Sequence, residues 1–442
     1  QEPEPQETVL AESPIFDVTQ LPRTPRLKEM DQVAKAYDLG LDTTDSIEAF
    51  CTSDPQVRKK IMDLFCPPSP DTAVFQSTKD FCHEVTALSS FRAKYPWADY
   101  QDILRFLLIF DLNCHGTQLF NLSTRLSHSC DPNTFCRTDH KTGKLTYVAT
   151  KEIKADQLLT FSYIGGGYIM LLPTPLRRKA LMKLGFICKC DRCQGPDILR
   201  TVRCPACGEE SCMPSYLMKP KLEGAQAKDA SHAGAEGNQQ VLASERHWRC
   251  YNHRCAKEFE DEQVPAEAQA RLEAEVLEYC CSLSPTDIRS ELPGPALWAI
   301  GVECEKVLGS MHWTNAVIMT AFLKFCSGVL FGESEEGLAL LPKPEKVIEV
   351  TFSLLEWFET RMGTSLEEAK ISPLAAQILS YFGLHKEAAS CLSRALPRLR
   401  LLNFTNIPSC ERCVREHGSA EMQAMAGLSS DGPSAASRKS KP

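Results

Sequence analysis

The chain has 442 residues, of which 43% are hydrophobic and 24% charged, and its net charge is −8. This length predicts two to four domains, and the acidic balance disfavours a general binder of nucleic acids or anionic membranes. No run of about 18 apolar residues predicts a membrane span, and QEPEPQET at the start lacks the basic and apolar regions of a secretory signal. The missing initiating Met suggests a fragment or a processed chain.

Cysteine usage indicates metal sites in a reduced compartment. The chain has 21 cysteines, an odd number, and several of them stand in C-x-C and C-x-x-C clusters. A disulfide framework would need an oxidising compartment, for which the sequence carries no export signal. We therefore expect an intracellular protein with thiolate-bound metal.

The first half of the chain predicts a helical segment followed by short strands. Residues 8–17 predict a strand that ends at Pro14, and 27–110 predict helices, with Thr43 or Asp45 as the start of one of them. From residue 112 turns alternate with short apolar stretches, which predict strands over 112–116, 145–150 and 158–164. A helix should then begin at Thr174 and end at Gly185.

The second half predicts a flexible loop and then helices. Residues 218–245 have few bulky hydrophobic side chains and predict a loop that projects from a metal module. Residues 263–403 have helical periodicity, and 378–396 predict two helices joined by a turn at Gly383, in the shape of one tetratricopeptide-like hairpin. Residues 418–442 are rich in Ser and Gly and predict a disordered tail.

The stretch FICKCDRC suggests one zinc site. Its Cys188, Cys190 and Cys193 can occupy three corners of a zinc tetrahedron. Cys130 in LSHSCDPN is the best fourth ligand, because Pro132 turns the chain there and the neighbouring residues are unusually polar. The alternative is three free buried thiols, which this spacing disfavours.

Two further cysteine pairs suggest a zinc ribbon. CPAC contributes Cys204 and Cys207, and RCYNHRC contributes Cys250 and Cys255. The second pair has C-x4-C spacing, so His253 or Cys212 could replace one ligand. A third pair in the last forty residues, Cys410 and Cys413 with His417 nearby, is as often unliganded as bound to metal.

Three motifs in order, SHSCDPN, DQLLTFSYI and FICKCDRC, resemble those of SET-domain protein lysine methyltransferases, and more narrowly of the SET and MYND family. The order of elements without a MYND finger also resembles the lysine methyltransferase of the parasite apical complex. The resemblance implies an α+β fold. It would comprise a β-rich SET domain with a helical insertion, a post-SET zinc site, a zinc-ribbon-like module and an all-α tetratricopeptide-like C-terminal domain.

The expected division of the chain follows from this resemblance. Each part is given by its residues: 1–185 for the SET domain with its insertion at about 27–110, 186–262 for the two zinc modules with the loop 218–245, 263–405 for the helical domain, and 406–442 for a polar tail with C-x-x-C.

The resemblance also implies roles for individual residues. Tyr163 corresponds to the catalytic tyrosine. Contact with S-adenosylmethionine is implied for four residues: Asn113, Ser127, His128 and Phe186. The zinc ligands implied for the post-SET site are Cys130, Cys188, Cys190 and Cys193. The implied reaction transfers a methyl group from S-adenosylmethionine to a lysine side chain of a protein substrate.

Two departures from the family favour an alternative function. Ser127 stands where the family has Asn, and the glycine-rich strand that should precede TVLAESPIF is absent. Either this chain begins after that strand or the protein binds the cofactor poorly. A MYND finger is also missing between the first strand and the helical insertion. A non-catalytic SET and tetratricopeptide-like scaffold that binds zinc and protein partners is therefore the second hypothesis. A zinc hydrolase is disfavoured because thiolate-rich sites are of the closed, structural kind.

The expected partners and compartment follow from charge and resemblance. We expect a protein substrate, no membrane and no direct nucleic-acid binding, and a homodimer stays open. The expected compartment is the cytoplasm or the cytoskeleton, in the apical complex if the closer resemblance holds, with the nucleus as a further option.

Overall fold

The computed structural model describes these residues: 7–18, 21–66, 75–139, 142–165, 168–182, 184–217, 245–280, 294–332, 341–363, 365–402, 404 and 406–428. Its internal contacts divide the chain into two compact units, which are described separately. The first is Gln1–Tyr163 with Ala180–Cys188, and the second is Ile164–Lys179 with Lys189–Pro442. The division passes through helix α7 (Thr174–Met182), whereas the sequence suggested a boundary after residue 185.

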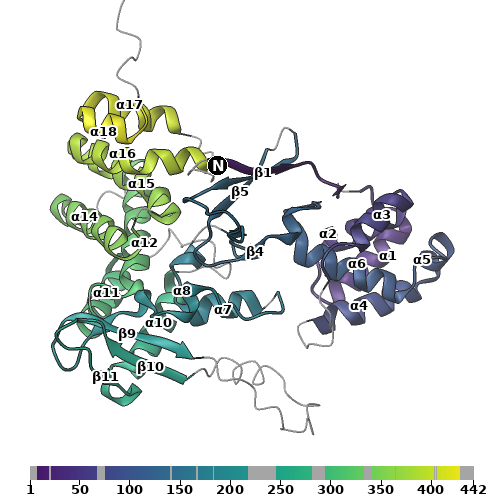
Figure 1. Cartoon of the computed structure of the whole chain (residues 1–442), viewed down its shortest axis with the longest axis horizontal. Helices are drawn as coiled ribbons and strands as arrows, with labels where there is room; N and C mark the ends of the chain where they lie inside the picture. Colours follow the sequence, from purple (N-terminus) through teal and green to yellow (C-terminus); the bar gives the residue numbers. More distant parts are fainter. Residues whose placement is uncertain are drawn as a thin grey trace, which may run out of the picture. The chain divides into compact units, whose positions relative to one another are not determined.

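The described residues between the first strands and the SHSCDPN motif form mainly α-helices, as the sequence predicts (Figure 1). They are α1 (Pro25–Ala36), α2 (Leu41–Thr52), α3 (Pro55–Met62), α4 (Gln76–Ala87), α5 (Ser89–Lys94) and α6 (Tyr100–Asn113). Helix α6 starts at a capping box in which Asp99 and Asp102 each accept a backbone N–H from the other. Its apolar side chains are buried in one core with Phe16 and Phe50, and Phe50 stacks on Phe106 at 4.2 Å between ring centroids.

Helix α2 begins earlier than the sequence suggested. It starts at Leu41 after Gly40, so neither Thr43 nor Asp45 is its cap. The carboxylate of Asp45 is instead buried and accepts both guanidinium N–H groups of Arg23. The ion pair holds the segment before α1 against α2, and this long-range use of Asp45 cannot be read from its position in the sequence.

The described strands of the first unit form three small sheets. The largest is antiparallel, in the order β1 (Thr8–Glu12), β6 (Lys144–Ala149) and β5 (Thr134–Asp139). The other two are pairs: β2 (Phe16–Asp17) with β3 (Gln118–Leu119), and β4 (Ser127–His128) with β7 (Thr160–Phe161). The strand expected over 8–17 is therefore two strands, the one expected over 158–164 shrinks to two residues, and residues 112 and 113 still belong to α6.

The second unit begins its core with a four-stranded antiparallel sheet. The strand order is β11 (Glu258–Phe259), β10 (Glu245–Cys250), β9 (Glu210–Leu217) and β8 (Val202–Arg203). Trp248 of β10 is buried in the same apolar cluster as Leu272 and Val276 of α10 (Ala266–Cys280). The ribbon therefore shares its core with the helices that follow. The loop expected at 218–245 lies almost entirely outside the described residues.

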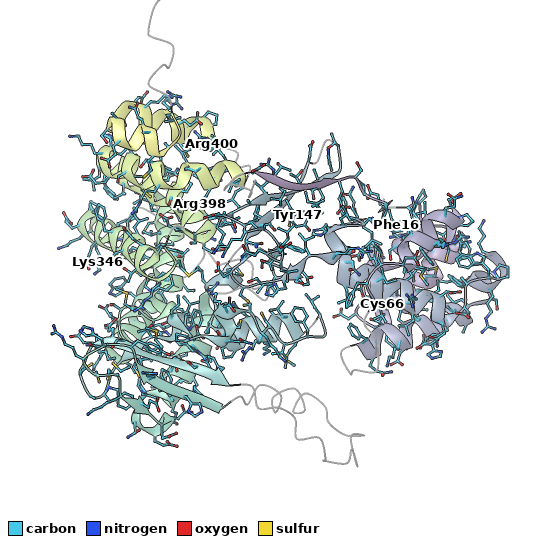
Figure 2. The ribbon with its side chains drawn as sticks, in the orientation of Figure 1. Phe16, Cys66, Tyr147, Lys346, Arg398 and Arg400 are labelled. Atoms are coloured by element: carbon cyan, nitrogen blue, oxygen red, sulfur yellow. The ribbon has the colours of Figure 1, made fainter. Side chains whose placement is uncertain are left out.

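Within the described residues, the helices after α10 pack largely in chain order: α11 (Gly294–Leu308), α12 (Trp313–Leu330), α14 (Pro344–Arg361), α15 (Leu366–Tyr381), α16 (His385–Leu401), α17 (Ile407–His417) and α18 (Ala420–Met425). The prediction of two helices joined by a turn at Gly383 is confirmed, because α15 and α16 pack together and Gly383 takes a positive φ of 80° between them. Their likeness to a tetratricopeptide hairpin stays a prediction. Figure 2 shows the side chains of this array, with Arg398 and Arg400 labelled on α16.

The disordered tail expected over 418–442 is wrong as far as Leu428, and an ordered helix also precedes it. Helices α17 and α18 cover Ile407–His417 and Ala420–Met425, and Ala426 and Leu428 are buried beside them. Few apolar residues are enough to order this segment, because they pack against a core that α15 and α16 already form. Residues 429–442 lie outside the described part of the chain.

Among the described residues one helix, α12, is long and apolar enough to cross a membrane by length and composition. Its 18-residue window is 61% buried within the structure, and Trp313 and Phe322 lie in the core of the second unit. A core helix meets the same test, so this is weak evidence for a membrane span.

Candidate functional site

The SHSCDPN motif lies beside the strand that leads to Tyr163. Strands β4 and β7 run parallel, with Ser127 opposite Thr160 and His128 opposite Phe161. The N–H of Ser129 donates to the carbonyl of Phe161 at 3.1 Å and continues the pairing. Two motifs about thirty residues apart in sequence are thus held side by side by backbone hydrogen bonds.

Asn133 at the end of the motif fastens this arrangement. Its side chain is buried, its Nδ2 donates to the carbonyl of Leu158 at 2.9 Å, and its Oδ1 accepts the N–H of Thr160 at 2.8 Å. The chain turns at Pro132, and from there the Asn133 side-chain amide, rather than backbone pairing, satisfies backbone groups of Leu158 and Thr160. The sequence pointed to this residue as part of an unusually polar octet but assigned it no role.

The hydroxyl of Tyr163 lies at the centre of a half-buried aromatic cluster. It donates a hydrogen bond to the carbonyl of Leu126, just before β4. Its ring contacts Phe161 at 4.8 Å and His128 at 5.4 Å between centroids. Burial raises the pKa of Tyr163, so the hydroxyl is protonated at neutral pH and serves as a hydrogen-bond donor.

Three further aromatic side chains, His115, Tyr147 and Phe161, pack together next to Tyr163. The hydroxyl of Tyr147 on β6 and the Nε2 of His115 lie 3.1 Å apart, and the ring of His115 stacks on Phe161 at 5.4 Å. Tyr147 (labelled in Figure 2) is fully buried. Burial lowers the pKa of His115 to about 4, so this imidazole is neutral at physiological pH. The sequence drew attention to neither residue.

Phe186 and Asn113 were both assigned to the cofactor, and they lie in different surroundings. Phe186 is half-buried, and its ring lies 6.0 Å from that of His128 and 6.1 Å from that of Tyr163. It is thus part of the site. Asn113 is the last residue of α6, where its Nδ2 donates to the carbonyls of Ile109 and Phe65. These contacts tie the helix end to the segment after α3, and the cofactor role of Asn113 stays a prediction.

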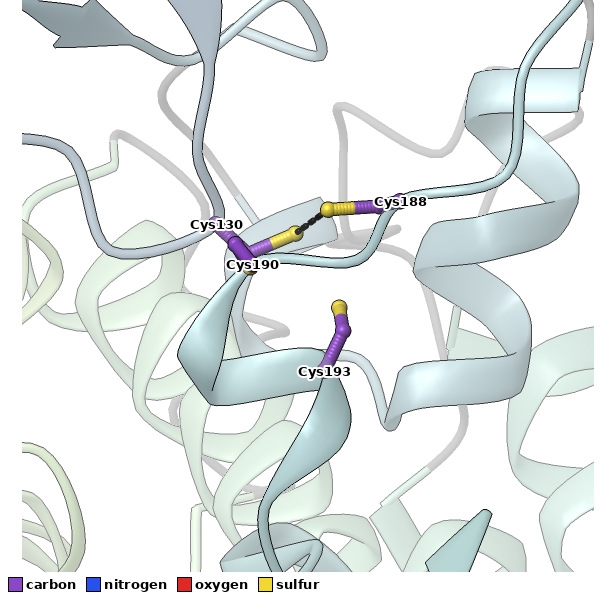
Figure 3. Close-up of side chains that lie close together, drawn as sticks. All are labelled: Cys130, Cys188, Cys190 and Cys193. Carbon is purple, nitrogen blue, oxygen red and sulfur yellow. Dashed lines mark hydrogen bonds between the residues drawn. The ribbon is translucent and has the colours of Figure 1, made fainter. Parts of the chain in front are cut away.

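Four thiols gather where the sequence suggested the first zinc site. The sulfurs of Cys130, Cys188, Cys190 and Cys193 all lie within 4.8 Å of one another, and Figure 3 shows the side chains pointing into a common space. The Sγ atoms of Cys130 and Cys188 are 4.0 Å apart. Disulfide sulfurs are about 2.05 Å apart, whereas thiolates on a tetrahedral zinc with bonds of about 2.3 Å are about 3.8 Å apart. The spacing fits a metal centre.

Arg177 of α7 supports anionic sulfur in this cluster. The Arg177 side chain is almost completely buried, and its NH2 donates to Sγ of Cys193 at 3.5 Å and to Oγ1 of Thr174 at 3.0 Å. A buried guanidinium is stable only beside acceptors, and thiolates are strong ones. The sequence identified this residue only as part of a helix body, since nothing local marks an arginine that faces inward.

The ribbon cysteines form a second group. The sulfurs of Cys204, Cys207, Cys250 and Cys255 lie within 4.8 Å of one another. The Cys204–Cys255 and Cys207–Cys250 separations are both 3.8 Å, again the value expected on a tetrahedral metal. The N–H of Ala206 donates to Sγ of Cys204 at 3.4 Å, which favours a thiolate there.

The alternative ligands lie outside both groups. Within the described part of the chain, neither Cys212 nor His253 belongs to a group of converging ligand atoms. Cys212 is buried in the ribbon core. Cys410 and Cys413 form no group of converging ligand atoms among the described residues either. Cys410 is buried in the helical core with Val414, and Cys413 is partly buried at the edge of that core. The two-site arrangement is the one that the geometry supports.

Comparison with known proteins agrees with this geometry. Residues 24–164 match the family model of the SET domain, which covers α1 to α6, β4 and Tyr163. This part of the chain is therefore similar to a SET domain. The match covers helices α1 to α6 together with strands β3 to β7, and the helical insertion expected at about 27–110 stays a prediction.

Curated relatives are similar over the same part of the chain. The chain is 31% identical over 160 residues to the histone-lysine N-methyltransferase SET5 of Eremothecium gossypii, which is 36% of this chain and 26% of that protein. It is 35% identical over 82 residues to the histone-lysine N-methyltransferase ATXR2 of Arabidopsis thaliana, which is 18% and 16% of the two chains.

A third relative has a MYND finger in its name. It is the SET domain and MYND-type zinc finger protein 6 of Schizosaccharomyces pombe, 38% identical over 80 residues, which is 18% of this chain and 15% of that protein. The matches span about a quarter or less of the length of these relatives. They therefore bear on the SET domain, and the activity of whole proteins enters below only as a proposal.

Proposed function

We propose that the chain is an S-adenosylmethionine-dependent protein-lysine N-methyltransferase. The observation that carries the proposal is the pairing of β4 with β7, which sets Tyr163 against the His128 and Phe186 rings. A SET domain match and relatives named histone-lysine N-methyltransferases support lysine as the target. Histones are therefore the first substrates to test.

The bound cofactor would supply an electrophilic methyl group on a sulfonium sulfur. Transfer to an amine requires the lysine to be neutral, desolvated and aimed in line with that methyl group. The site offers an apolar lining from Phe161 and Tyr147 and a hydroxyl at Tyr163 that is fixed by the carbonyl of Leu126. These groups can exclude water and orient an amine without any strong acid.

Ser127, His128 and Phe186 would hold the cofactor. Ser127 and His128 present a strand backbone beside the half-exposed Phe186 ring, and backbone groups together with a ring face suit an adenosine moiety. Ser127 lacks the amide of the family's Asn, so we propose that its backbone makes the contact. Asn113 is retained as a fourth, more distant contributor.

The finer classification is proposed as well. Zinc bound by the two four-thiol groups would make the first of them a post-SET site, and the helices α10 to α18 would form a tetratricopeptide-like domain of the kind found in the SET and MYND group. An intracellular location and a protein partner follow from this grouping. The likeness to the apical-complex enzyme and a homodimer remain predictions.

Substitution Tyr163→Phe tests the proposal. Loss of one hydroxyl that orients the amine should lower kcat by about 100-fold while the midpoint of thermal unfolding changes little. The measurement is mass spectrometry of lysine methylation on histones incubated with cofactor. The matched control is Tyr381→Phe on α15, a half-exposed tyrosine in the second unit, which should methylate like the wild type. Equal activity of both variants would refute the role of Tyr163.

A non-catalytic scaffold is the second candidate, and Ser127 in place of Asn is the observation that favours it. The scaffold predicts no binding of S-adenosylmethionine. Isothermal titration calorimetry of the zinc-loaded chain with S-adenosylhomocysteine separates the two functions, because heat of binding at one site per chain supports the enzyme and its complete absence supports the scaffold.

A further inference from the structure

His128 lies between a sulfur of the thiol cluster and the backbone of Tyr163. Its Nε2 is 3.2 Å from Sγ of Cys130, and its Nδ1 accepts the backbone N–H of Tyr163 at 3.0 Å. All three residues belong to the first unit. One imidazole therefore contacts both the candidate metal centre and the candidate catalytic residue.

The hydrogen bond from Tyr163 decides which ring nitrogen carries the proton. A peptide N–H can only donate, so Nδ1 must offer its lone pair and cannot itself be protonated. In a neutral ring the proton then sits on Nε2, which points at the sulfur of Cys130. The result is an Nε2–H···S bond, and this polarity suits a metal-bound thiolate, which accepts hydrogen bonds and donates none.

The acceptor at Nδ1 replaces a missing backbone partner. The pairing of β4 with β7 ends at His128 and Phe161, and the last backbone bond runs from the N–H of Ser129 to the carbonyl of Phe161. Tyr163 follows two residues later, where the chain has turned away from β4. Its N–H is satisfied by the imidazole, so the direction in which Tyr163 leaves the strand depends on where that ring sits.

We propose that His128 is a positioning residue that couples the thiol cluster to Tyr163, through Nε2–H···Sγ of Cys130 on one side and Nδ1···H–N of Tyr163 on the other. The inference deepens the proposed function and rests on it for the role of Tyr163. It assigns to the His128 side chain a role other than the cofactor contact that the resemblance implies. A loss of metal would release the ring, and the tyrosine would lose its fixed orientation.

The tautomer is the first test, and it needs no substitution in the protein that is measured. The protein is labelled with ¹⁵N-histidine, loaded with zinc, and examined by long-range ¹H–¹⁵N correlation spectra, with His128→Asn used only to assign the signal. We expect the Nε2–H tautomer at neutral pH. An Nδ1–H tautomer or a fully protonated ring would overturn the inference.

Two substitutions of the same residue separate the two bonds. In His128→Asn the side-chain oxygen can take the place of Nδ1 and accept the N–H of Tyr163, but nothing reaches Cys130. In His128→Gln the amide nitrogen can take the place of Nε2 and donate to Cys130, but the acceptor for Tyr163 is lost. His83→Asn is the control, because His83 is exposed on α4 and stacks on Tyr100, away from both groups.

The expected results differ in kind between the variants. Hydrogen bonds to metal ligands typically account for 10- to 100-fold in metal affinity, so His128→Asn should release zinc to a chromogenic chelator about 10-fold more readily than wild type and His128→Gln should not. His128→Gln should lose more kcat than His128→Asn at saturating zinc, with KM changed less than kcat. Equal zinc retention in His128→Asn and wild type would overturn the inference.

The design separates this inference from the proposed function. Zinc retention and the histidine tautomer are read without turnover. A wild type that binds cofactor but methylates nothing would refute the methyltransferase proposal and remove the role of Tyr163 with it. If the wild type is active and His128→Asn and His128→Gln show the same zinc release and the same kcat, the coupling is refuted and the methyltransferase proposal stays intact.

Discussion

Single buried polar side chains determine most of the geometry around Tyr163. His115, His128 and Asn133 each connect segments that are distant in sequence, and each does so through hydrogen bonds with defined donors and acceptors. A buried polar group without its partner is destabilising by about 1–3 kcal/mol, so such residues tolerate few replacements. Matched substitutions separate their contribution to the fold from their contribution to the site.

The neutral His115 should make stability depend on pH. The folded-state pKa of His115 is about 4, below the ordinary value of 6.5. Between pH 4 and pH 6.5 His115 is therefore protonated in the unfolded chain and neutral in the folded chain. The stabilisation is complete above pH 6.5 and decreases as pH falls towards 4. Urea unfolding followed by circular dichroism should show about 1–2 kcal/mol less stability at pH 5 than at pH 7 from this group.

His115→Gln is the matched variant for this measurement, since glutamine keeps a hydrogen-bonding group near Tyr147 and does not titrate. It should be less stable than wild type at pH 7 and show a flatter dependence between pH 7 and pH 5. A variant whose stability falls with pH as steeply as that of the wild type would show that other groups control the acid sensitivity.

At the scale of elements, the site depends on strands too short to persist alone. β4 and β7 have two residues each, and a two-residue pair has little intrinsic stability. Asn133 after β4 and the carboxylate of Glu12, which accepts the N–H groups of Leu122 and Ser123 before β4, fix the segment at both ends. The polar composition of the motif is therefore a structural requirement as well as a chemical one.

Asn133→Ala should release the motif from β7. It removes three side-chain hydrogen bonds and leaves the N–H and the hydroxyl of Thr160 and the carbonyl of Leu158 without this partner, so we expect a loss of about 2–4 kcal/mol in stability and a large loss of methylation. Differential scanning calorimetry and the histone assay measure the two effects. Asn121→Ala, at an exposed position in the same segment, should change neither, and equal effects of both substitutions would contradict this role of Asn133.

At the scale of the whole molecule, each unit has its own core, and in the second unit that core runs from the ribbon into the helices. Trp248 and Cys212 of the ribbon share one cluster with Leu272 of α10 and Trp313 of α12. Bound metal would therefore stabilise more than the loop that holds it, because metal binding contributes to the folding free energy of every element packed on the site.

Cys207→Ser tests the ribbon metal. The thiol of Cys207 is exposed, so its loss disturbs packing little and removes mainly a ligand. The metal content measured by inductively coupled plasma mass spectrometry should fall from two zinc ions per chain to one, and the unfolding transition of the second unit should shift to lower temperature. Cys413→Ser, outside both thiol groups, should retain two. Two ions per chain in Cys207→Ser would exclude Cys207 as a ligand.

Much of the candidate site could be predicted from the sequence, because its chemistry lies in short motifs. C-x-C and C-x-x-C spacings restrict thiols to a few geometries, and the eight thiols assigned to zinc are those that the structure gathers. The helices with strong apolar periodicity and the hairpin at Gly383 were predictable for the same reason, since local propensity and core burial agree there.

The sequence by itself determined which residues are available to bind metal and where the long helices run, since both depend on spacings of a few residues. The tertiary structure alone decided that Asp45 pairs with Arg23, that Arg177 faces a sulfur, and that His128 bridges Cys130 and Tyr163. The physical reason is that a buried polar side chain must take whichever partner the fold brings within about 3 Å, and that partner can stand anywhere in the chain.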